Sequence, residues 1–208
     1  MSKYLENEFV IFDTEYTAWK GSQARNFSGE NEHREIIQIG AIKVKLVDNK
    51  YTVIDKINDV GYIYVKPKIN TILSDYIINL TGISNKNISE EGYTFEDALN
   101  IFIKFCGNSK VYSYGNDWNS VVEENIELYE KKFPKTYNYD FIRDFGEKCH
   151  NIIPYFKKYG IDTSKYTSGT IYKSVNIEVN IDNNHFAIFD CLSIFMTINK
   201  LFILNSLQ

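Results

Sequence analysis

Phe9-Val10-Ile11-Phe12-Asp13-Thr14-Glu15 is the stretch that decides the fold, because four apolar residues lead directly into two acids separated by one threonine. A short apolar run of this kind predicts a buried strand near the start of the fold. Residues two apart on a strand point to the same face, so the carboxylates of Asp13 and Glu15 are expected to lie together. Like charges on a buried strand repel each other and are costly to desolvate, and a divalent cation offsets both effects. An acidic turn after a core strand has the same pattern, so a metal site requires further ligands elsewhere in the chain.

Length and composition indicate one soluble α/β domain. The chain has 208 residues, of which 44% are hydrophobic and 24% are charged, and it is long enough to bury a sizeable core. The sequence contains no internal repeat, low-complexity tract or linker, so residues 1–208 are expected to form a single domain. The formal net charge of −4 argues against a protein that coats nucleic acid through bulk electrostatics. It is compatible with an enzyme that holds one strand end in a small cleft.

The cysteines and the termini predict a cytoplasmic protein. The three cysteines are an odd number without metal-ligand spacing, and Cys106 and Cys191 stand among apolar residues. Reduced, buried thiols suit the cytoplasm. The N-terminus lacks the apolar segment of a secretory signal. The run 189–204 is apolar but is too short and too interrupted by polar residues to span a bilayer, so we expect it to be a buried helix.

Hydrophobic periodicity and turn signals predict a mixed sheet packed between helices. The first three strands are expected at 9–15, 35–44 and 51–66, with a turn at 48–50, and form a meander. Further strands are expected at 110–114 and, with a weaker pattern, at 137–145. Helices are expected at 72–80, where Gly82 ends the helix, at 95–105, where Thr94 caps it, and at 117–132, 146–159 with a break at Pro154, 168–175 and 187–204. Strands first, followed by alternating helix and strand, are typical of a mixed sheet with helices on its faces.

Two later positions supply the further acids that the first pair requires. Asp117 follows a predicted strand and precedes a helix, where a carboxylate can either bind a metal or cap free backbone N–H groups. Asp190 lies near the start of the last helix among apolar residues, and a buried acid needs a cation or a hydrogen-bond donor. His185 precedes it by five residues, which is about 140° around a helix. The two side chains can therefore converge only if His185 lies on the loop before the helix.

The ordered set Asp13-x-Glu15, then Asp117, then His185-x-Ala187-x-x-Asp190 resembles the DEDD 3′–5′ exonucleases of the histidine subtype. Phe186 stands four positions before the last Asp, where the tyrosine subtype has Tyr. Four further segments are similar to the Eri-type branch, which trims small and structured RNAs: Glu35-Ile36-Ile37-Gln38-Ile39-Gly40-Ala41, Leu80-Thr81-Gly82-Ile83-Ser84, Tyr93-Thr94-Phe95 and Tyr114-Gly115-Asn116-Asp117-Trp118. The resemblance covers nearly the whole chain and implies a ribonuclease-H-like fold. It is carried by the order and the separations of the motifs, since each motif alone is weak.

Three positions depart from the family pattern. Cys191 and Leu192 follow the last Asp, where the family often has a second acid and a small residue. Tyr16 follows the first pair of acids, where small residues are usual. These departures leave the four acids and the histidine in place, and they concern the substrate and the rate more than the chemistry.

The resemblance implies a two-metal site that binds Mg²⁺ or Mn²⁺. Asp13 would bridge the two ions, and Glu15 and Asp190 would complete the ligands of the ion on the nucleophile side. Asp117 would hold the other ion through water. His185 would act as the general base that takes a proton from the attacking water, because imidazole titrates near neutral pH.

Residues beside the acids are candidates for binding the last nucleotides of a single strand, since unpaired bases stack on aromatic rings. Tyr16, Trp19 and Trp118 lie next to the acids in the sequence. The resemblance also places Thr14 and Ile83 against the terminal nucleotide. For each aromatic residue, packing in the core is the alternative.

The predicted function is a metal-dependent exonuclease that releases nucleoside 5′-monophosphates from the 3′ end of single-stranded RNA or DNA. The resemblance also allows a homodimer. One alternative is a catalytically weak nucleic-acid-binding or complex-forming subunit with the same fold. Another is a single-metal phosphatase or phosphodiesterase that acts on small molecules. The sequence does not distinguish RNA from DNA.

Overall fold

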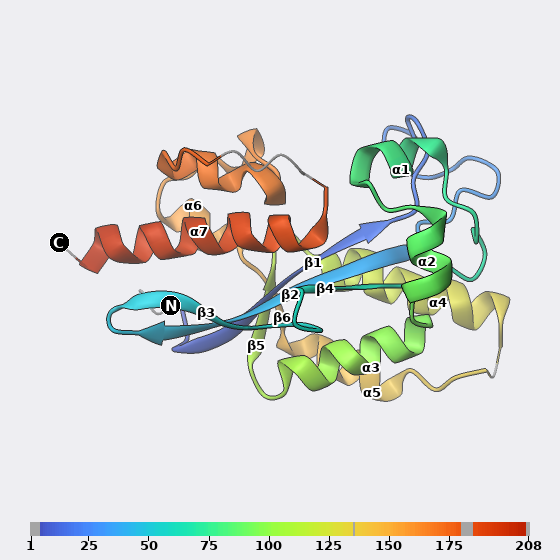
Figure 1. Cartoon of the computed structure of the whole chain (residues 1–208), viewed down its shortest axis with the longest axis horizontal. Coiled ribbons are helices and arrows are strands. Elements are labelled where there is room, and N and C mark those ends of the chain that lie inside the picture. The colour runs from blue at the N-terminus through green and yellow to red at the C-terminus, as the bar shows by residue number, and fades with distance from the viewer. Residues whose placement is uncertain (1–4, 135, 180–184, 207–208) are drawn as a thin grey trace.

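The computed structural model describes residues 5–134, 136–179 and 185–206. Within these residues a mixed six-stranded sheet has the order β3-β2-β1-β5-β6, with β4 paired to β2 (Figure 1). β1, β2 and β3 are antiparallel neighbours, which confirms the predicted meander, and β5 and β6 add to β1 in parallel. The strands are β1 (Glu8–Tyr16), β2 (Ile36–Val47), β3 (Lys50–Lys56), β4 (Tyr62–Tyr64), β5 (Lys110–Ser113) and β6 (Cys149–Asn151).

Two turns shape the meander. Asp48 and Asn49 connect β2 to β3 with positive φ angles of 48° and 58°, the conformation of a two-residue hairpin loop. The single strand predicted over 51–66 is wrong in its middle, because residues 57–61 form a second turn. After that turn, β4 continues along the first half of β2, where Gly40 pairs with a tyrosine of β4.

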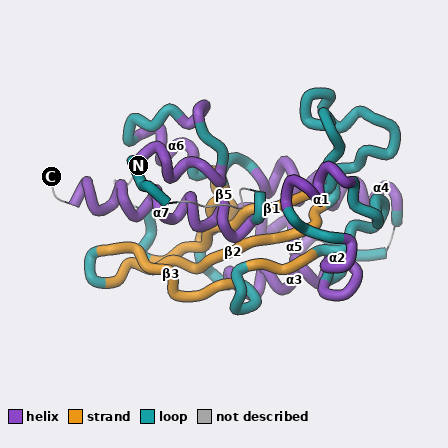
Figure 2. Tube along the Cα trace, turned by 45° about the horizontal axis from the view of Figure 1, so that its top comes forward, coloured by secondary structure: helices purple, strands orange, loops and turns teal. Residues whose placement is uncertain are grey.

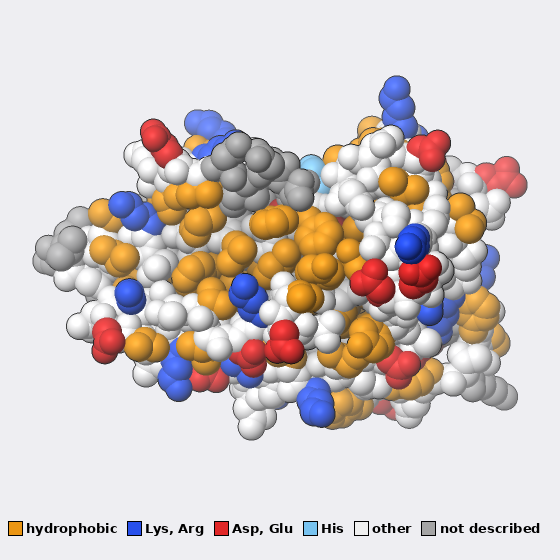
Figure 3. All heavy atoms as spheres, in the orientation of Figure 1, with side chains coloured by type: hydrophobic (Ala, Val, Ile, Leu, Met, Phe, Trp, Pro, Cys, Tyr) orange, Lys and Arg blue, Asp and Glu red, His pale blue; other side chains and the backbone are white. Residues whose placement is uncertain are grey.

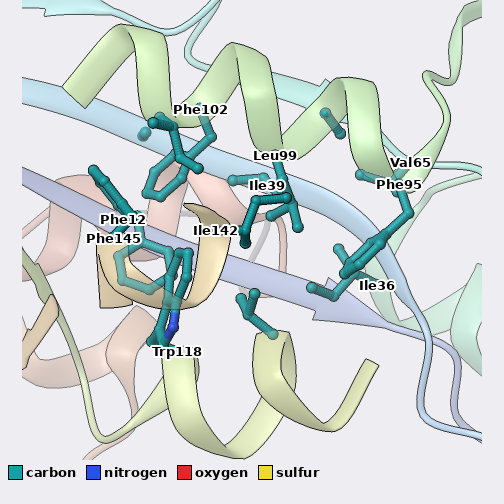
Figure 4. Close-up of a cluster of buried hydrophobic side chains, with 14 of the residues drawn as sticks. Phe12, Ile36, Ile39, Val65, Phe95, Leu99, Phe102, Trp118, Ile142 and Phe145 are labelled. Carbon is teal, nitrogen blue, oxygen red and sulfur yellow. The ribbon is translucent and has the colours of Figure 1, made fainter. Parts of the chain in front are cut away.

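Helices cover both faces of the sheet (Figures 1 and 2). α3, α4 and α5 pack on one face, and their apolar side chains form with those of the sheet the core cluster drawn in Figure 4. α6, η4 and α7 cover the other face. α1 and α2 lie near the carboxyl end of β1 (Figure 1). The helices are α1 (Asp75–Thr81), α2 (Asn85–Glu91), α3 (Phe95–Cys106), the π-helical turn η1 (Trp118–Val122), α4 (Glu123–Lys132), α5 (Asp140–Phe145), α6 (Ile153–Lys158), α7 (Ala187–Ser206) and the 3₁₀ segments η2 (Gly146–Lys148), η3 (Thr163–Lys165) and η4 (Ser168–Val175).

Capping residues set the ends of α1, α2 and α3. Thr94 caps α3 through its side chain, and Gly82 ends α1 in the left-handed conformation, both as predicted. α1 begins only after Ser74, whose side chain caps it, which is later than predicted. α2 was not predicted, although a reciprocal capping box between Ser84 and Asn87 marks its start.

The segment after α4 differs most from the prediction. The strand predicted over 137–145 is wrong: α5 forms there because Ile142 and Phe145, three residues apart, both reach the core. The helix predicted over 146–159 is wrong in its first half, where β6 extends the sheet beside β5. Pro154 stands in the first turn of α6, a helix position that tolerates proline.

α7 crosses the sheet against β1 and β2 and determines where the last acid lies. By length and composition α7 could span a membrane, so the expectation that this segment is too short and interrupted is wrong, but 56% of its apolar window is buried inside the protein. Gly40 of β2 permits its close approach, because a Cβ at Gly40 would lie 2.6 Å from the carbonyl carbon of Ala187. The Ala187 N–H also donates a hydrogen bond to Oε1 of Gln38 at 2.9 Å.

Candidate active site

Asp13 and Glu15 lie on the last part of β1, and their exposed fractions are only 6% and 8%. The strand register pairs Asp13 with Gly40 and Glu15 with Gln38 of β2. These are the two residues of β2 against which Ala187 packs. The first two acids therefore lie beside the start of α7.

Asp190 lies in the first turn of α7 and is 5% exposed. One carboxylate oxygen from each of Asp13, Glu15 and Asp190 lies within 4.8 Å of the other two. Carboxylates that converge this closely are the ligands expected around a hard divalent cation.

Asp117 lies between β5 and η1, and β5 runs parallel to β1. Its side chain forms no capping hydrogen bond with the helix that follows, so the structure does not support the alternative of a helix cap. Its charge acts on Asp13 and Glu15 and raises the pKa of both. Parallel pairing of the strands thus brings this acid to the same end of the sheet as the first two.

His185 lies on the loop just before α7, as its convergence with Asp190 requires. It has a positive φ of 73°, and its side chain is exposed. Burial raises the pKa of Asp190, and the Ser168 side chain and His185 oppose that rise. His185 is therefore close enough to the acids to act on their charge.

Burial raises the pKa of all four carboxyl groups, and the charges of neighbouring acids add to the rise for Asp13, Glu15 and Asp117. Burial is the largest cause for Asp13, followed by the charges of Asp190, Asp117 and Glu15. The pKa of Asp117 is raised to about 7 by burial and then by Asp190, while Arg34 opposes the rise. Without a cation, the ionised acids repel one another in surroundings that solvate them poorly.

The donor atoms fit a divalent cation. All four acids offer carboxylate oxygens, which Mg²⁺ and Mn²⁺ prefer. Asp190 Oδ1 and Thr14 Oγ1 are buried and have no hydrogen-bond partner among the described residues. A buried oxygen without a partner costs about 1–3 kcal/mol, so an ion or its water would relieve that cost. The acidic cluster therefore suggests that the protein uses a divalent metal.

The four acids and His185 line one cavity of about 570 Å³. Its wall includes residues that the sequence reasoning did not single out for the site. α1 contributes Tyr76, Ile77 and Leu80 to this wall. Tyr114 and Tyr166 add their phenol rings. Aromatic and apolar side chains around convergent polar groups are typical of ligand sites.

Ser168 is the missed residue with the most direct contact to the acids. Its hydroxyl donates a hydrogen bond to Oδ2 of Asp190 at 2.8 Å. This contact occupies one carboxylate oxygen of Asp190 and leaves Oδ1 available. No sequence pattern could have identified Ser168, because the contact joins the start of η4 to α7 across 22 residues.

Ser168→Ala is expected to weaken Mn²⁺ binding by about 10-fold, because hydrogen bonds that orient a ligand typically contribute 10- to 100-fold to metal affinity. Isothermal titration with Mn²⁺ measures the effect, and Ser168→Thr, which keeps the hydroxyl, is expected to recover part of it. Ser89→Ala removes an exposed serine on α2 and serves as the control. Equal Mn²⁺ affinities for Ser168→Ala and the wild type would contradict the orienting role.

Of the five residues predicted to contact substrate, Thr14 and Tyr16 line the cavity. Trp118 is 3% exposed and packs in the core cluster (Figure 4), and Ile83 is fully buried. Neither side chain lines the cavity, and the contacts with substrate predicted for Trp118 and Ile83 stay predictions. Trp19 is half-buried and also lies outside the cavity lining.

Comparisons with solved structures show the same fold in several exonucleases. The chain is similar to a 3′-exonuclease described in 3′-end-specific recognition of a histone mRNA stem-loop, with a TM-score of 0.69 and 19% identity over 96% of this chain. It is also similar to the nuclease domain of 3′hExo, a DEDDh family member bound to rAMP, with a TM-score of 0.61 and 20% identity over 96% of this chain and 92% of that one. E. coli exonuclease I in complex with a dT13 oligonucleotide matches with a TM-score of 0.57 and 14% identity over 94% of this chain. The chain spans 64% of the first of these proteins and 41% of exonuclease I.

Sequence comparison assigns the family. No curated protein matches the chain. The family model for exonucleases, RNase_T, matches residues 10–195, which include all four acids and His185. This chain therefore belongs to the exonuclease family.

Proposed function

We propose that this protein is a divalent-metal-dependent 3′–5′ exonuclease of the histidine subtype, similar to the Eri-type branch, which shortens single-stranded RNA or DNA to nucleoside 5′-monophosphates. The observation that carries the proposal is the convergence of Asp13, Glu15 and Asp190 within 4.8 Å, with Asp117 and His185 in the same cavity. Membership of the exonuclease family supports nuclease chemistry. The 3′ to 5′ direction and the subtype rest on the identity and order of these five residues.

The acids divide between two ions in this proposal. Asp13, Glu15 and Asp190 would hold one ion, and Asp13 with Asp117 would hold the second. A pair of divalent ions supplies an activated water and stabilises the leaving 3′-oxygen. The protein's own contribution is to hold the four carboxylates around one cavity, with the Ser168 hydroxyl orienting Asp190.

His185 is the proposed general base. Its side chain is exposed on the loop before α7 and lines the cavity, so it can take a proton from a water near the acids and release it to solvent. The chain before α7 holds the imidazole next to Asp190. Removing the imidazole should therefore affect proton transfer more than metal binding.

The shape and the charge of the molecule favour a strand end as the substrate. A cavity of about 570 Å³ falls in the size range of sites that hold a small ligand. On the face shown in Figure 3, the described Lys and Arg side chains are interspersed with Asp and Glu, without a broad basic area. Binding would therefore depend on the cavity more than on the surface field. Structural relatives that hold rAMP or dT13 support a nucleic acid end as the occupant.

Two of the three departures from the family pattern lie outside the cavity lining. Cys191 is fully buried, and neither Cys191 nor Leu192 lines the cavity. They therefore offer no support for a catalytically weak subunit. Tyr16 does line the cavity, so it is the departure that bears on substrate.

Incubation of the protein with 5′-labelled RNA and DNA strands of matched sequence tests the proposal. With Mg²⁺ we expect a ladder that shortens from the 3′ end, and we expect EDTA and Asp117→Asn each to abolish it. His185→Asn is expected to lower kcat by about 10²- to 10⁴-fold while leaving Mn²⁺ affinity unchanged. If the wild type degrades neither the RNA nor the DNA strand, the proposal is contradicted.

The same samples distinguish the alternatives. Binding of strands without turnover would indicate a nucleic-acid-binding subunit. Turnover of a chromogenic phosphodiester, without turnover of oligonucleotides, would indicate a small-molecule phosphodiesterase. A difference in rate between the two matched strands would assign RNA or DNA as the preferred substrate.

A further inference from the structure

The start of α7 is joined to the sheet by one side chain of β2. Ala187 is the first residue of α7, and the first N–H groups of a helix have no acceptor within the helix itself. The amide oxygen of Gln38 accepts a hydrogen bond from the Ala187 N–H at 2.9 Å, across 149 residues of the chain. Gln38 is fully buried and does not line the cavity of the four acids. It therefore contacts the backbone of α7 rather than anything that binds in that cavity.

This hydrogen bond is the one polar contact of the Gln38 side chain among the described residues. Only the oxygen of an amide accepts a hydrogen bond, so the oxygen faces Ala187, and the buried Nε2 has no partner in the described part of the chain. Gly40, two residues along the same face of β2, allows the close approach, since a Cβ there would lie 2.7 Å from the Cβ of Ala187. The amide of Gln38 therefore serves to fix the first turn of α7 against the sheet.

His185 has a backbone conformation that depends on this end of α7. Its φ of 73° lies in the left-handed region, which residues other than glycine adopt infrequently and keep only where the surroundings hold them. The next residue, Phe186, packs its ring edge-on against that of Tyr62 on β4, with 4.8 Å between the centroids. The residue after that, Ala187, is held by Gln38. Both residues that follow the histidine are thus fixed to the sheet.

We propose that Gln38 is a positioning residue for His185, because its amide oxygen fixes the start of α7 and with it the place of the imidazole beside the acids. The inference rests on the proposed function, in which His185 is the general base. A displacement of about 1 Å at a reacting group can cost about 100-fold in rate. Asp190 lies farther along α7 and has its own support from the Ser168 hydroxyl. Loss of the Gln38 contact should therefore affect proton transfer more than metal binding.

Gln38→Met tests the proposal, because it removes the acceptor oxygen and keeps the length of the side chain. It is expected to lower kcat about 10- to 100-fold and to leave KM and Mn²⁺ affinity within about threefold of the wild type. Gln38→Glu keeps an acceptor oxygen at the same reach. In saturating Mg²⁺ it should recover kcat to within about threefold of the wild type.

Asn199→Leu is the matched control, because Asn199 forms the same kind of bond at a distant point of α7. Its Oδ1 accepts a hydrogen bond from the Tyr51 N–H of β3 at 3.1 Å, and it lies about 18 Å along the helix from Ala187. Both variants remove one amide oxygen that joins α7 to the sheet, so both should lower Tm. Only Gln38→Met should lower kcat. Equal losses of kcat in the two variants would overturn the proposal, since the loss would then follow stability alone.

The double variant Gln38→Met/His185→Asn asks whether Gln38 acts through the imidazole. With the base removed, loss of the Gln38 contact should change kcat less than about twofold, whereas independent effects would multiply. A further loss of 10-fold or more in the double variant would contradict the proposal. Tyr62→Leu removes the other contact at this end of α7 from a half-buried position, and it should lower kcat in the same way if Gln38→Met does not fold.

Hydrogen exchange measured by mass spectrometry reads the contact without turnover. Gln38→Met should speed exchange at least about 10-fold in peptides that cover residues 186–190, and Asn199→Leu should leave it unchanged there. Unchanged exchange in Gln38→Met would show that the bond does not hold the start of α7. Failure of the exonuclease function would appear separately, as intact strands with the wild type in Mg²⁺ while the exchange still responds to the substitution.

Discussion

Asp13→Asn is expected to abolish hydrolysis and to stabilise the metal-free protein. Asp13 lies among the other three acids, and their charges raise its pKa after the effect of burial. Loss of its charge should reduce kcat/KM at least about 1,000-fold, which corresponds to about 4 kcal/mol of transition-state stabilisation. In EDTA at pH 8 the same change removes like-charge repulsion, so Tm should rise by about 2–4 °C.

Glu127→Gln is the control for Asp13→Asn, because it also removes one acid but at an exposed position on α4. It should leave both activity and Tm within error of the wild type. Rates come from the labelled-strand assay, and Tm from circular dichroism in EDTA. If Asp13→Asn keeps a tenth of the wild-type activity, or lowers Tm in EDTA, the arrangement of acids does not have the role argued above.

The stability of the metal-free protein is expected to fall as pH rises from 5 to 7.5. Each of the four acids has a pKa that is raised in the folded state. The folded protein therefore binds more protons than the unfolded chain, and the stability from this source is present at low pH and lost as pH rises through the folded pKa. For Asp117 that value is about 7. At about 1.4 kcal/mol per pKa unit, we expect a loss on the order of 2 kcal/mol over this range.

The chosen pH range separates the four acids from the carboxyl, cysteine and tyrosine groups whose pKa is also shifted. Carboxyl groups with a lowered pKa, such as those of Glu6 and Glu96, are ionised throughout this range. Cysteine and tyrosine side chains with a raised pKa stay protonated throughout it. Urea denaturation in EDTA at pH 5, 6 and 7.5 measures the fall. Excess Mg²⁺ should reverse it, because the ion binds the ionised carboxylates of the folded state. A rise in stability with pH in EDTA would contradict the predicted sign.

Elements with strong local signals were predictable from the sequence. The apolar run of β1, the turn at Asp48 and Asn49, and the Thr94 cap of α3 depend on neighbouring residues, and the structure confirms each of them. The segments predicted over 137–145 and 146–159 failed because short elements take their conformation from packing. α5 is a helix since its apolar residues reach the core, and β6 is a strand since β5 provides an edge to pair with.

The candidate site also depends partly on local sequence and partly on tertiary structure. The sequence alone predicted which residues would carry the chemistry, from the spacing of Asp13 and Glu15 on one strand and from the acids and the histidine that follow in order. Only the tertiary structure decided that they meet, because parallel pairing of β5 with β1 places Asp117, and the missing side chain of Gly40 allows α7 to carry Asp190 to the same point.

Contacts between distant parts of the chain also decided the residues around the acids. Ser168 reaches Asp190 only because η4 packs on α7, and Trp118 packs in the core cluster. Phe27 has a left-handed backbone conformation, and its ring packs edge-on against that of Tyr16. Strand periodicity and helix caps act over a few residues and can be seen in a sequence, whereas these contacts depend on how whole elements pack.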